Sequence, residues 1–372
     1  MDFDYVVLPA IILTVGILVI WLSIRRIRSL TTRKYRAWRS ISERVAFSAV
    51  ILLAVVAAGS STFNAIALQA YRKAHPPQGA FYTVNGRQMY IHCTGSGSPT
   101  IVLDSGYGSD SLTWQIVQPE LSKTTRVCSF DRAGSGWSDP QPGLRDADQI
   151  SQQLHDLLHQ AQVNGPIVLM GHSIAGLYIR DYATHYPADI AGIVFVDGSS
   201  PSQFHNPLFT AEMVKGPTWL LYRATSILGI PRLLWICSLS APGLDAHAGL
   251  VDAEDRFRGH IGALQTEMDS FPQSADETAQ TGPYGALPIL IFTQDTDKTS
   301  AEGEPNIAVA WRQMQEDLKK LSTRSRRIIA KGSGHYIHID RADLIEKEVP
   351  LFIQQIRGTA PQPSNYGSTT PE

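Results

Sequence analysis

Ser173 lies in a run of mostly small residues, Gly171-His172-Ser173-Ile174-Ala175-Gly176, that directly follows the apolar segment Ile167–Met170. Small residues two before and two after a serine let the chain turn tightly from a strand into a helix without a Cβ clash. Such a turn exposes the hydroxyl above the sheet, and the N-terminus of the following helix favours negative charge that develops beside it. The pattern therefore predicts a nucleophilic serine.

A serine hydroxyl is a weak nucleophile near neutral pH, so it needs a histidine base and an acid that orients the base. His335 is the predicted base, and it lies in Gly332-Ser333-Gly334-His335-Tyr336, directly after the strand expected over Arg326–Ala330. His338 follows shortly afterwards and is an alternative base. His172 is expected to pack or to form a hydrogen bond, because chain geometry points it away from its neighbour Ser173.

Strands are expected to alternate with helices from residue 76 onward. Phe81–Val84 and Gln88–His92 flank Asn85-Gly86, a dipeptide typical of hairpin turns. The other expected strands are Ile101–Leu103, Arg126–Phe130, Ile167–Met170, Ile193–Val196, Ile289–Thr293 and Arg326–Ala330, and the helices are Ala147–Gln162, Ile307–Leu321 and Leu344–Ile356. This alternation predicts an α/β fold with a mostly parallel sheet, helices on both faces and an antiparallel edge.

The segment Ser200–Gly285 interrupts the alternation, contains no evident strand and is expected to form a helical cap. The cap would divide the core into residues 76–199 and 286–357, and the Pro/Ser/Thr-rich residues 358–372 are expected to be a disordered tail. Apolar cap residues would line an acyl pocket or form the cap's own core: Trp219, Leu220, Leu221, Ile227, Leu228, Leu233, Leu234 and Trp235.

Residues 1–75 are expected to form a two-helix membrane anchor. Val6–Ile24 and Ala46–Ala70 contain no charged residue. A helix over the first run would come close to the roughly 30 Å of a bilayer's hydrocarbon core. Cleavage within the second run as a signal peptide is the alternative, but a preceding hydrophobic helix argues against it.

The loop between the two apolar runs, residues 25–44, carries many basic residues and a single acid, Glu43. A short loop this basic stays on the cytoplasmic side of a membrane. We therefore expect a multi-pass membrane protein with its large domain on the periplasmic or extracellular side, and membrane lipid as a partner of the two helices.

Three segments together resemble the α/β-hydrolase superfamily: the run around Ser173, residues 131–139 (DRAGSGWSD) and Gly334-His335. More narrowly, SPTIVLDSG, RVCSFDRAGSGWSD, GHSIAGLYIR and VFVDGSSP resemble bacterial, membrane-anchored lipase/esterase-like serine hydrolases. The resemblance covers roughly residues 80–356. It departs at Ala175, where glycine is usual, and at Ser105-Gly106, where His-Gly usually precedes the loop that binds the oxyanion.

The resemblance implies the order serine, acid, histidine along the chain. Asp297 matches the usual position of the acid, and Asp295 and Asp197 are alternatives. One oxyanion N–H should come from Ile174, and Tyr107 is our choice for the second. Asp131 and Arg132 are expected to form a structural ion pair that fixes their loop.

The expected activity is hydrolysis of a carboxylic ester, with apolar or lipid-like esters as substrates, through an acyl-enzyme. The same triad could serve an acyltransferase, thioesterase, amidase or C–C hydrolase, and a binding or sensor protein on the same scaffold is an alternative of another class. The sequence has no HExxH, GxGxxG or phosphate-loop motif, so no metal or cofactor is expected. A formal net charge of −2 gives no indication of nucleic acid as a partner.

The three cysteines are Cys93, Cys128 and Cys237, an odd number that cannot all pair within one chain. They would be small buried hydrophobic residues, or Cys93 and Cys128 would form one disulfide outside the cytosol.

Overall fold

The structure is a computed structural model that describes residues 7–32, 37–74, 76–209, 221, 224–225, 228–230, 261–295 and 305–359. Its centre is an eight-stranded sheet in the order β1-β2-β4-β3-β5-β6-β7-β8. The strands are β1 (Ala80–Val84), β2 (Arg87–Thr94), β3 (Thr100–Asp104), β4 (Val127–Phe130), β5 (Ile167–His172), β6 (Ile190–Val196), β7 (Ile289–Gln294) and β8 (Ser325–Ala330). The six strands β3 to β8 run parallel to one another, and β1 and β2 form an antiparallel edge, as the sequence predicts.

The hairpin between β1 and β2 turns at Asn85 and Gly86, which have φ angles of 51° and 74°. Both values are positive, as a two-residue hairpin turn of this kind requires, and glycine and asparagine adopt them more readily than other residues. The turn fixes the register in which Val84 pairs with Arg87 and Ala80 with Ile91.

Helices cover both faces of the sheet, and alternate residues of each strand point to opposite faces. On one face, α4 (Ala147–Gln160) and α5 (Ala175–His185) pack on a cluster that includes Val102, Leu169 and Phe195. On the other, α3 (Val117–Leu121) and α16 (Ala342–Thr359) pack on a cluster that includes Ile101, Val168 and Val194. Two further helices of the core are α14 (Pro305–Asp317) and α15 (Ile337–Asp340).

Where the structure describes the insertion between β6 and β7, it includes the helices α6 (Pro201–His205), α11 (Ile261–Asp269) and α12 (Phe271–Thr278). Most of the apolar residues that we expected to form the cap's pocket or core, including Trp219, Leu233 and Trp235, lie outside the described residues, as do residues 360–372 of the expected tail.

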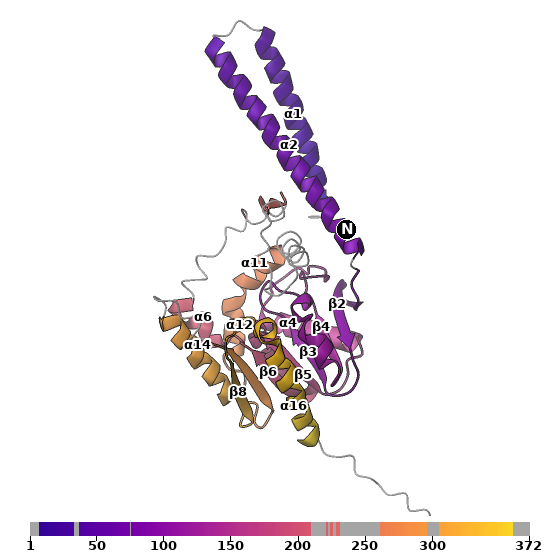
Figure 1. The fold of residues 1–372 in the computed structure, drawn as a ribbon, viewed down its shortest axis with the longest axis vertical. Coiled ribbons are helices and arrows are strands. Elements are labelled where there is room, and N and C mark those ends of the chain that lie inside the picture. The colour runs from indigo at the N-terminus through magenta and orange to yellow at the C-terminus, as the bar shows by residue number, and fades with distance from the viewer. Residues whose placement is uncertain are drawn as a thin grey trace, which may run out of the picture.

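Two long helices precede the sheet, α1 (Leu8–Thr32) and α2 (Ala37–Ala74), and they run side by side away from the rest of the chain (Figure 1). Each contains an apolar stretch long enough to cross a membrane, Pro9–Leu30 and Ile41–Ala67. Large apolar side chains on both helices are exposed, among them Ile17, Leu52 and Leu53. Exposed apolar helices of this length suit lipid as their surroundings.

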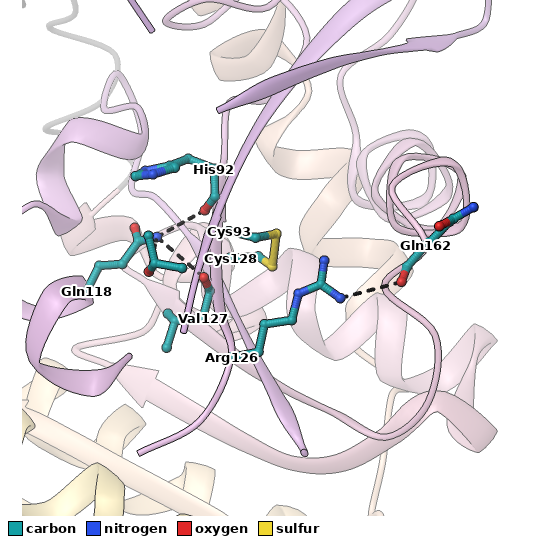
Figure 2. The surroundings of a disulfide bond; sticks show 8 residues. His92, Cys93, Gln118, Arg126, Val127, Cys128 and Gln162 are labelled. Carbon is teal, nitrogen blue, oxygen red and sulfur yellow. Dashed lines mark hydrogen bonds between the residues drawn. A yellow bond between two sulfur atoms is a disulfide. The ribbon is translucent and has the colours of Figure 1, made fainter. Parts of the chain in front are cut away.

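Cys93 and Cys128 form a disulfide between β2 and β4, where they are direct partners in the register (Figure 2). Their Cα atoms lie 4.0 Å apart. Beside the bridge, Gln118 of α3 donates hydrogen bonds to the carbonyl oxygens of His92 (3.0 Å) and Val127 (3.4 Å). The disulfide and this side chain both join the antiparallel edge to the parallel part of the sheet.

Candidate active site

The turn at Ser173 joins β5 to α5 and has the strained geometry that the sequence predicts. Ser173 has a φ angle of 54°, in a region that non-glycine residues rarely adopt. Its backbone carbonyl accepts hydrogen bonds from the N–H groups of Gly176 (2.9 Å) and Ser199 (2.7 Å). These bonds close the turn and hold the serine side chain at the carboxyl end of β5.

Close contacts require the glycines of this turn. They also explain why Ala175 can stand where the α/β-hydrolases that the sequence resembles usually have glycine. A Cβ atom on Gly171 would lie 2.9 Å from Ile179 Cδ1, and one on Gly176 would lie 2.7 Å from the Ser199 oxygen. The residue that must lack a side chain after the serine is therefore Gly176, and the preceding position accepts alanine.

A chain of hydrogen bonds joins Ser173 to a histidine and an aspartate. His335 Nε2 lies 2.9 Å from Ser173 Oγ, and His335 Nδ1 lies 2.6 Å from Asp197 Oδ2. Asp197 is buried, whereas 35% of the His335 side chain is exposed. A serine, a histidine that contacts it and a carboxylate that orients the histidine are the three parts of a nucleophilic triad.

Among the described residues, the structure brings one of the two alternative acids to His335. Asp297, which we preferred, lies outside the described residues, and the Nδ1 atom of His335 is already bonded to Asp197, one of the two alternatives. Asp197 follows β6 directly, and its φ angle of 49° turns the chain at the carboxyl edge of the sheet. Asp295, the other alternative, instead accepts a hydrogen bond from the Gly332 N–H at 2.9 Å and so braces a loop.

Asp197 is held by two further donors. Its Oδ1 atom accepts hydrogen bonds from the Gln294 N–H and from Trp311 Nε1, both at 3.0 Å. Trp311 also places its ring 5.9 Å from that of His335. The sequence gives no local signal for the role of Trp311, which is one aromatic residue in an amphipathic helix.

The two other histidines near the turn are buried and do not contact the serine hydroxyl. His172 Nε2 lies 3.1 Å from the His335 carbonyl oxygen, and His338 Nε2 lies 2.8 Å from Thr113 Oγ1. Burial lowers the pKa of both imidazoles, that of His338 to about 3. Both are therefore neutral at pH 7, and the structure favours His335 over His338 as the base.

The loop after β3 approaches the turn closely. A Cβ atom on Gly106 would lie 2.6 Å from His172 Nδ1 and 3.3 Å from Ser173 Cβ, so only glycine fits there. The next residue is Tyr107, our choice for an oxyanion donor. Ile174, our other choice, lies at the N-terminus of α5, where the first backbone N–H groups of a helix have no acceptor within the helix.

Arg132 is part of an ion pair, but its partner differs from our expectation. It contacts the carboxylates of Asp104 (2.6 Å) and Glu267 (2.9 Å). Asp131 accepts hydrogen bonds from the backbone N–H groups of Ser111 and Trp137, both at 2.8 Å. The predicted pairing of Asp131 with Arg132 is therefore wrong: the buried arginine bonds across the loop, where more distant carboxylates and carbonyl oxygens fit its planar fork.

The comparisons with known proteins agree with this fold. The sequence profile of the alpha/beta hydrolase family matches residues 101–348. The Bacillus subtilis protein YqjL is 26% identical over 270 residues, which cover 71% of this chain and 87% of that protein.

Among solved structures, a thermophilic esterase from Thermogutta terrifontis is similar with a TM-score of 0.56 and 18% identity, over 75% of this chain and 99% of the esterase. An esterase from Exiguobacterium antarcticum has a TM-score of 0.58 and 15% identity, over 74% of this chain and 100% of its own. These likenesses show a shared fold. Because the family profile matches well over half of the sequence, the chain belongs to the alpha/beta hydrolase family.

Proposed function

We propose that this protein is a serine hydrolase that cleaves carboxylic esters through an acyl-enzyme. The observation that carries the proposal is the hydrogen-bonded chain Ser173–His335–Asp197, with distances of 2.9 and 2.6 Å. Both distances are within the reach that proton transfer requires. A binding protein that had lost catalysis would have no need to keep all three groups in this arrangement.

In the proposed reaction, His335 Nε2 takes the proton of Ser173 Oγ while the oxygen attacks the ester carbonyl. Asp197 holds the ring in the tautomer with its proton on Nδ1 and stabilises the imidazolium that forms. The backbone N–H groups of Ile174 and Tyr107 would bind the negative oxygen of the tetrahedral intermediate. The alcohol leaves with the proton from His335, and a water molecule, activated by the same base, then releases the acid.

We further propose that α1 and α2 anchor the enzyme in a membrane and that the catalytic domain faces the periplasm or the exterior. The basic loop between the two helices supports a cytoplasmic position for that loop. The Cys93–Cys128 bridge supports an oxidising compartment for the catalytic domain, because disulfides persist mainly outside the cytosol. An enzyme held at a bilayer would meet apolar esters at high local concentration.

A chain-length series of p-nitrophenyl esters tests the proposed activity, with the full chain in detergent micelles. The wild type should release p-nitrophenol, and Ser173→Ala should reduce kcat by about 10⁵–10⁶-fold. The kcat/KM ratio should rise with acyl length if apolar esters are the substrates. A wild type without turnover of any ester, or a Ser173→Ala variant as active as the wild type, would refute the proposal.

A further inference from the structure

The loop after β3 is held by a buried arginine whose position the triad does not explain. Arg132 Nη1 lies 2.6 Å from Asp104 Oδ1 and 2.5 Å from the Ser105 carbonyl oxygen, and its Nη2 lies 3.0 Å from the Gly106 carbonyl oxygen. Only 3% of the Arg132 side chain is exposed. One guanidinium therefore holds the last residue of β3 and the first two residues of the loop.

The Gly106 carbonyl oxygen accepts hydrogen bonds from Arg132 Nη2 and from the Ser109 N–H at 3.1 Å, and these bonds set where the next N–H group points. The carbonyl oxygen of Gly106 and the N–H of Tyr107 belong to one planar trans peptide, so they point in opposite directions. With its oxygen held by Arg132, this peptide directs the Tyr107 N–H away from the arginine. Polarisation of the carbonyl by a positive charge also makes the N–H of the same peptide a stronger donor.

The arginine is itself fixed by the insertion. Glu267 of α11 accepts a hydrogen bond from Arg132 Nη2 at 2.9 Å, from Arg145 Nη2 at 3.0 Å and from the Tyr178 hydroxyl at 3.1 Å. Burial alone would raise the pKa of Glu267, but the charges of Arg132 and Arg145 outweigh it and lower the pKa. The carboxylate is therefore ionised at neutral pH, and both of its oxygens are used.

A second contact joins the same loop to the same helix. The Tyr107 hydroxyl donates a hydrogen bond to the Leu264 carbonyl oxygen of α11 at 3.1 Å, and its ring packs edge-on against Phe271 of α12, with centroids 5.2 Å apart. Leu264 lies one turn before Glu267. The loop is thus attached to α11 through the Arg132 guanidinium and through the Tyr107 side chain.

Stability alone is a poor explanation for this network. Burying charged groups costs about as much free energy as their attraction returns, and apolar side chains of similar volume often stabilise a fold as well. A charged, planar guanidinium does something that apolar side chains cannot do: it fixes the orientation of several hydrogen-bond acceptors at once. The acceptors here are carbonyl oxygens of the loop that carries a proposed catalytic N–H.

We propose that Arg132 and Glu267 are positioning residues for the oxyanion donor at Tyr107, so that α11 of the insertion sets the geometry of the catalytic loop. The inference rests on the proposed ester hydrolysis. It also makes the insertion part of the catalytic apparatus: a displacement of α11 would turn the Gly106–Tyr107 peptide and weaken the stabilisation of the tetrahedral intermediate.

The test compares Glu267→Gln with the matched variant Glu277→Gln, which alters a glutamate on α12 of the same insertion. For each full-length protein in detergent, active sites are titrated with a fluorophosphonate. The kcat per titrated site and the KM are then measured with a p-nitrophenyl ester. The inhibition constant of an alkyl boronic acid, which mimics the tetrahedral intermediate, is measured as well.

Glu267→Gln should lower kcat per site at least tenfold, towards the roughly 10²–10³-fold that loss of an oxyanion donor costs, with KM within about threefold. Boronate binding should weaken by a similar factor, and Glu277→Gln should match the wild type. If Glu267→Gln only reduces the number of titratable sites, with kcat per site unchanged, the network is merely structural and the inference is wrong.

Tyr107→Phe gives an independent answer if Glu267→Gln does not fold. It removes the hydroxyl that bonds to Leu264 and leaves the backbone N–H in place, so kcat per site and boronate affinity should fall together by about three- to tenfold. An unchanged kcat and boronate affinity in Tyr107→Phe would overturn the inference. A wild type that shows no labelling and no turnover would instead refute the proposed function.

Discussion

Asp197 is the residue on which the geometry of the site depends most. Its Oδ2 atom orients His335, and its Oδ1 atom is fixed by the Gln294 N–H and by Trp311. Asp197→Asn should reduce kcat for an ester by about 10⁴-fold, because an amide stabilises the wrong tautomer of the histidine and cannot stabilise the imidazolium. Steady-state kinetics on the purified variant measures this loss.

Asp295→Asn is the matched control for that experiment. Its carboxylate accepts the Gly332 N–H and does not contact His335 in the described part of the chain. It should change kcat by less than about fivefold. If Asp197→Asn keeps more than a tenth of the wild-type kcat, the acid lies elsewhere, and Asp297 becomes the first residue to examine.

The buried histidine beside the triad makes a separate prediction about pH. Burial, together with the nearby His335, lowers the pKa of His338 to about 3, below the ordinary value of 6.5. Between these values the unfolded chain binds a proton that the folded chain does not, so His338 destabilises the fold as pH falls below 6.5. Its contribution between pH 7 and pH 5 amounts to about 2 kcal/mol.

His338→Gln should remove this contribution. Its amide can still bond to Thr113, and it carries no titrating group. The loss of unfolding free energy between pH 7 and pH 5, measured by urea titration with tryptophan fluorescence, should be about 2 kcal/mol smaller in the variant. Equal pH dependences for the two proteins would count against a buried neutral His338.

At the scale of elements, the sequence predicts the sheet and the positions of Ser173 and His335 because both depend on local signals. Short apolar runs indicate the strands, and glycines at positions where a Cβ would clash indicate the turn at Ser173. The acid could not be chosen in this way. Asp197, Asp295 and Asp297 all follow strands of the same sheet, and only the three-dimensional packing around His335 separates Asp197 from Asp295.

The same limit applies to Arg132. Sequence proximity suggested Asp131 as its partner, but the bonds that form connect it to Asp104 on one side and to Glu267, far along the chain, on the other. Local patterns therefore predict which residues turn the chain, whereas pairings between distant elements require the assembled fold.

The disulfide joins two neighbouring elements, β2 and β4, and should stabilise the edge of the sheet. Replacing both Cys93 and Cys128 by alanine should reduce the free energy of unfolding by about 2–4 kcal/mol, because the bridge restricts the unfolded chain. The kcat per folded molecule should stay within about twofold, since neither cysteine contacts the triad in the described residues.

Thiol titration of the denatured protein provides the check on the bridge itself. Without reductant one of the three cysteines should react, and with reductant all three. Three reactive thiols in protein purified without reductant would show that the bridge does not form in the cell.

At the scale of the whole molecule, the two apolar helices and the basic loop define an orientation. A reporter that is active only outside the cytosol should be active when fused after Glu372, and a cytosolic reporter should be active when inserted after Thr32, between the two candidate spans. The paired fusions control for expression. The opposite pattern would place the catalytic domain in the cytosol and contradict the proposed topology.

The central claim is that Ser173 is a nucleophile activated by His335 and Asp197. Labelling of the full chain with a fluorophosphonate, followed by mass spectrometry of its peptides, tests this claim most directly. The probe should modify Ser173 alone. Ser199→Ala, which removes a side-chain hydroxyl but keeps the backbone N–H that closes the turn, should label at the wild-type rate. His335→Ala should label at least 10³-fold more slowly, and Ser173→Ala should not label. Modification of another residue, or undiminished labelling of Ser173→Ala, would contradict the account.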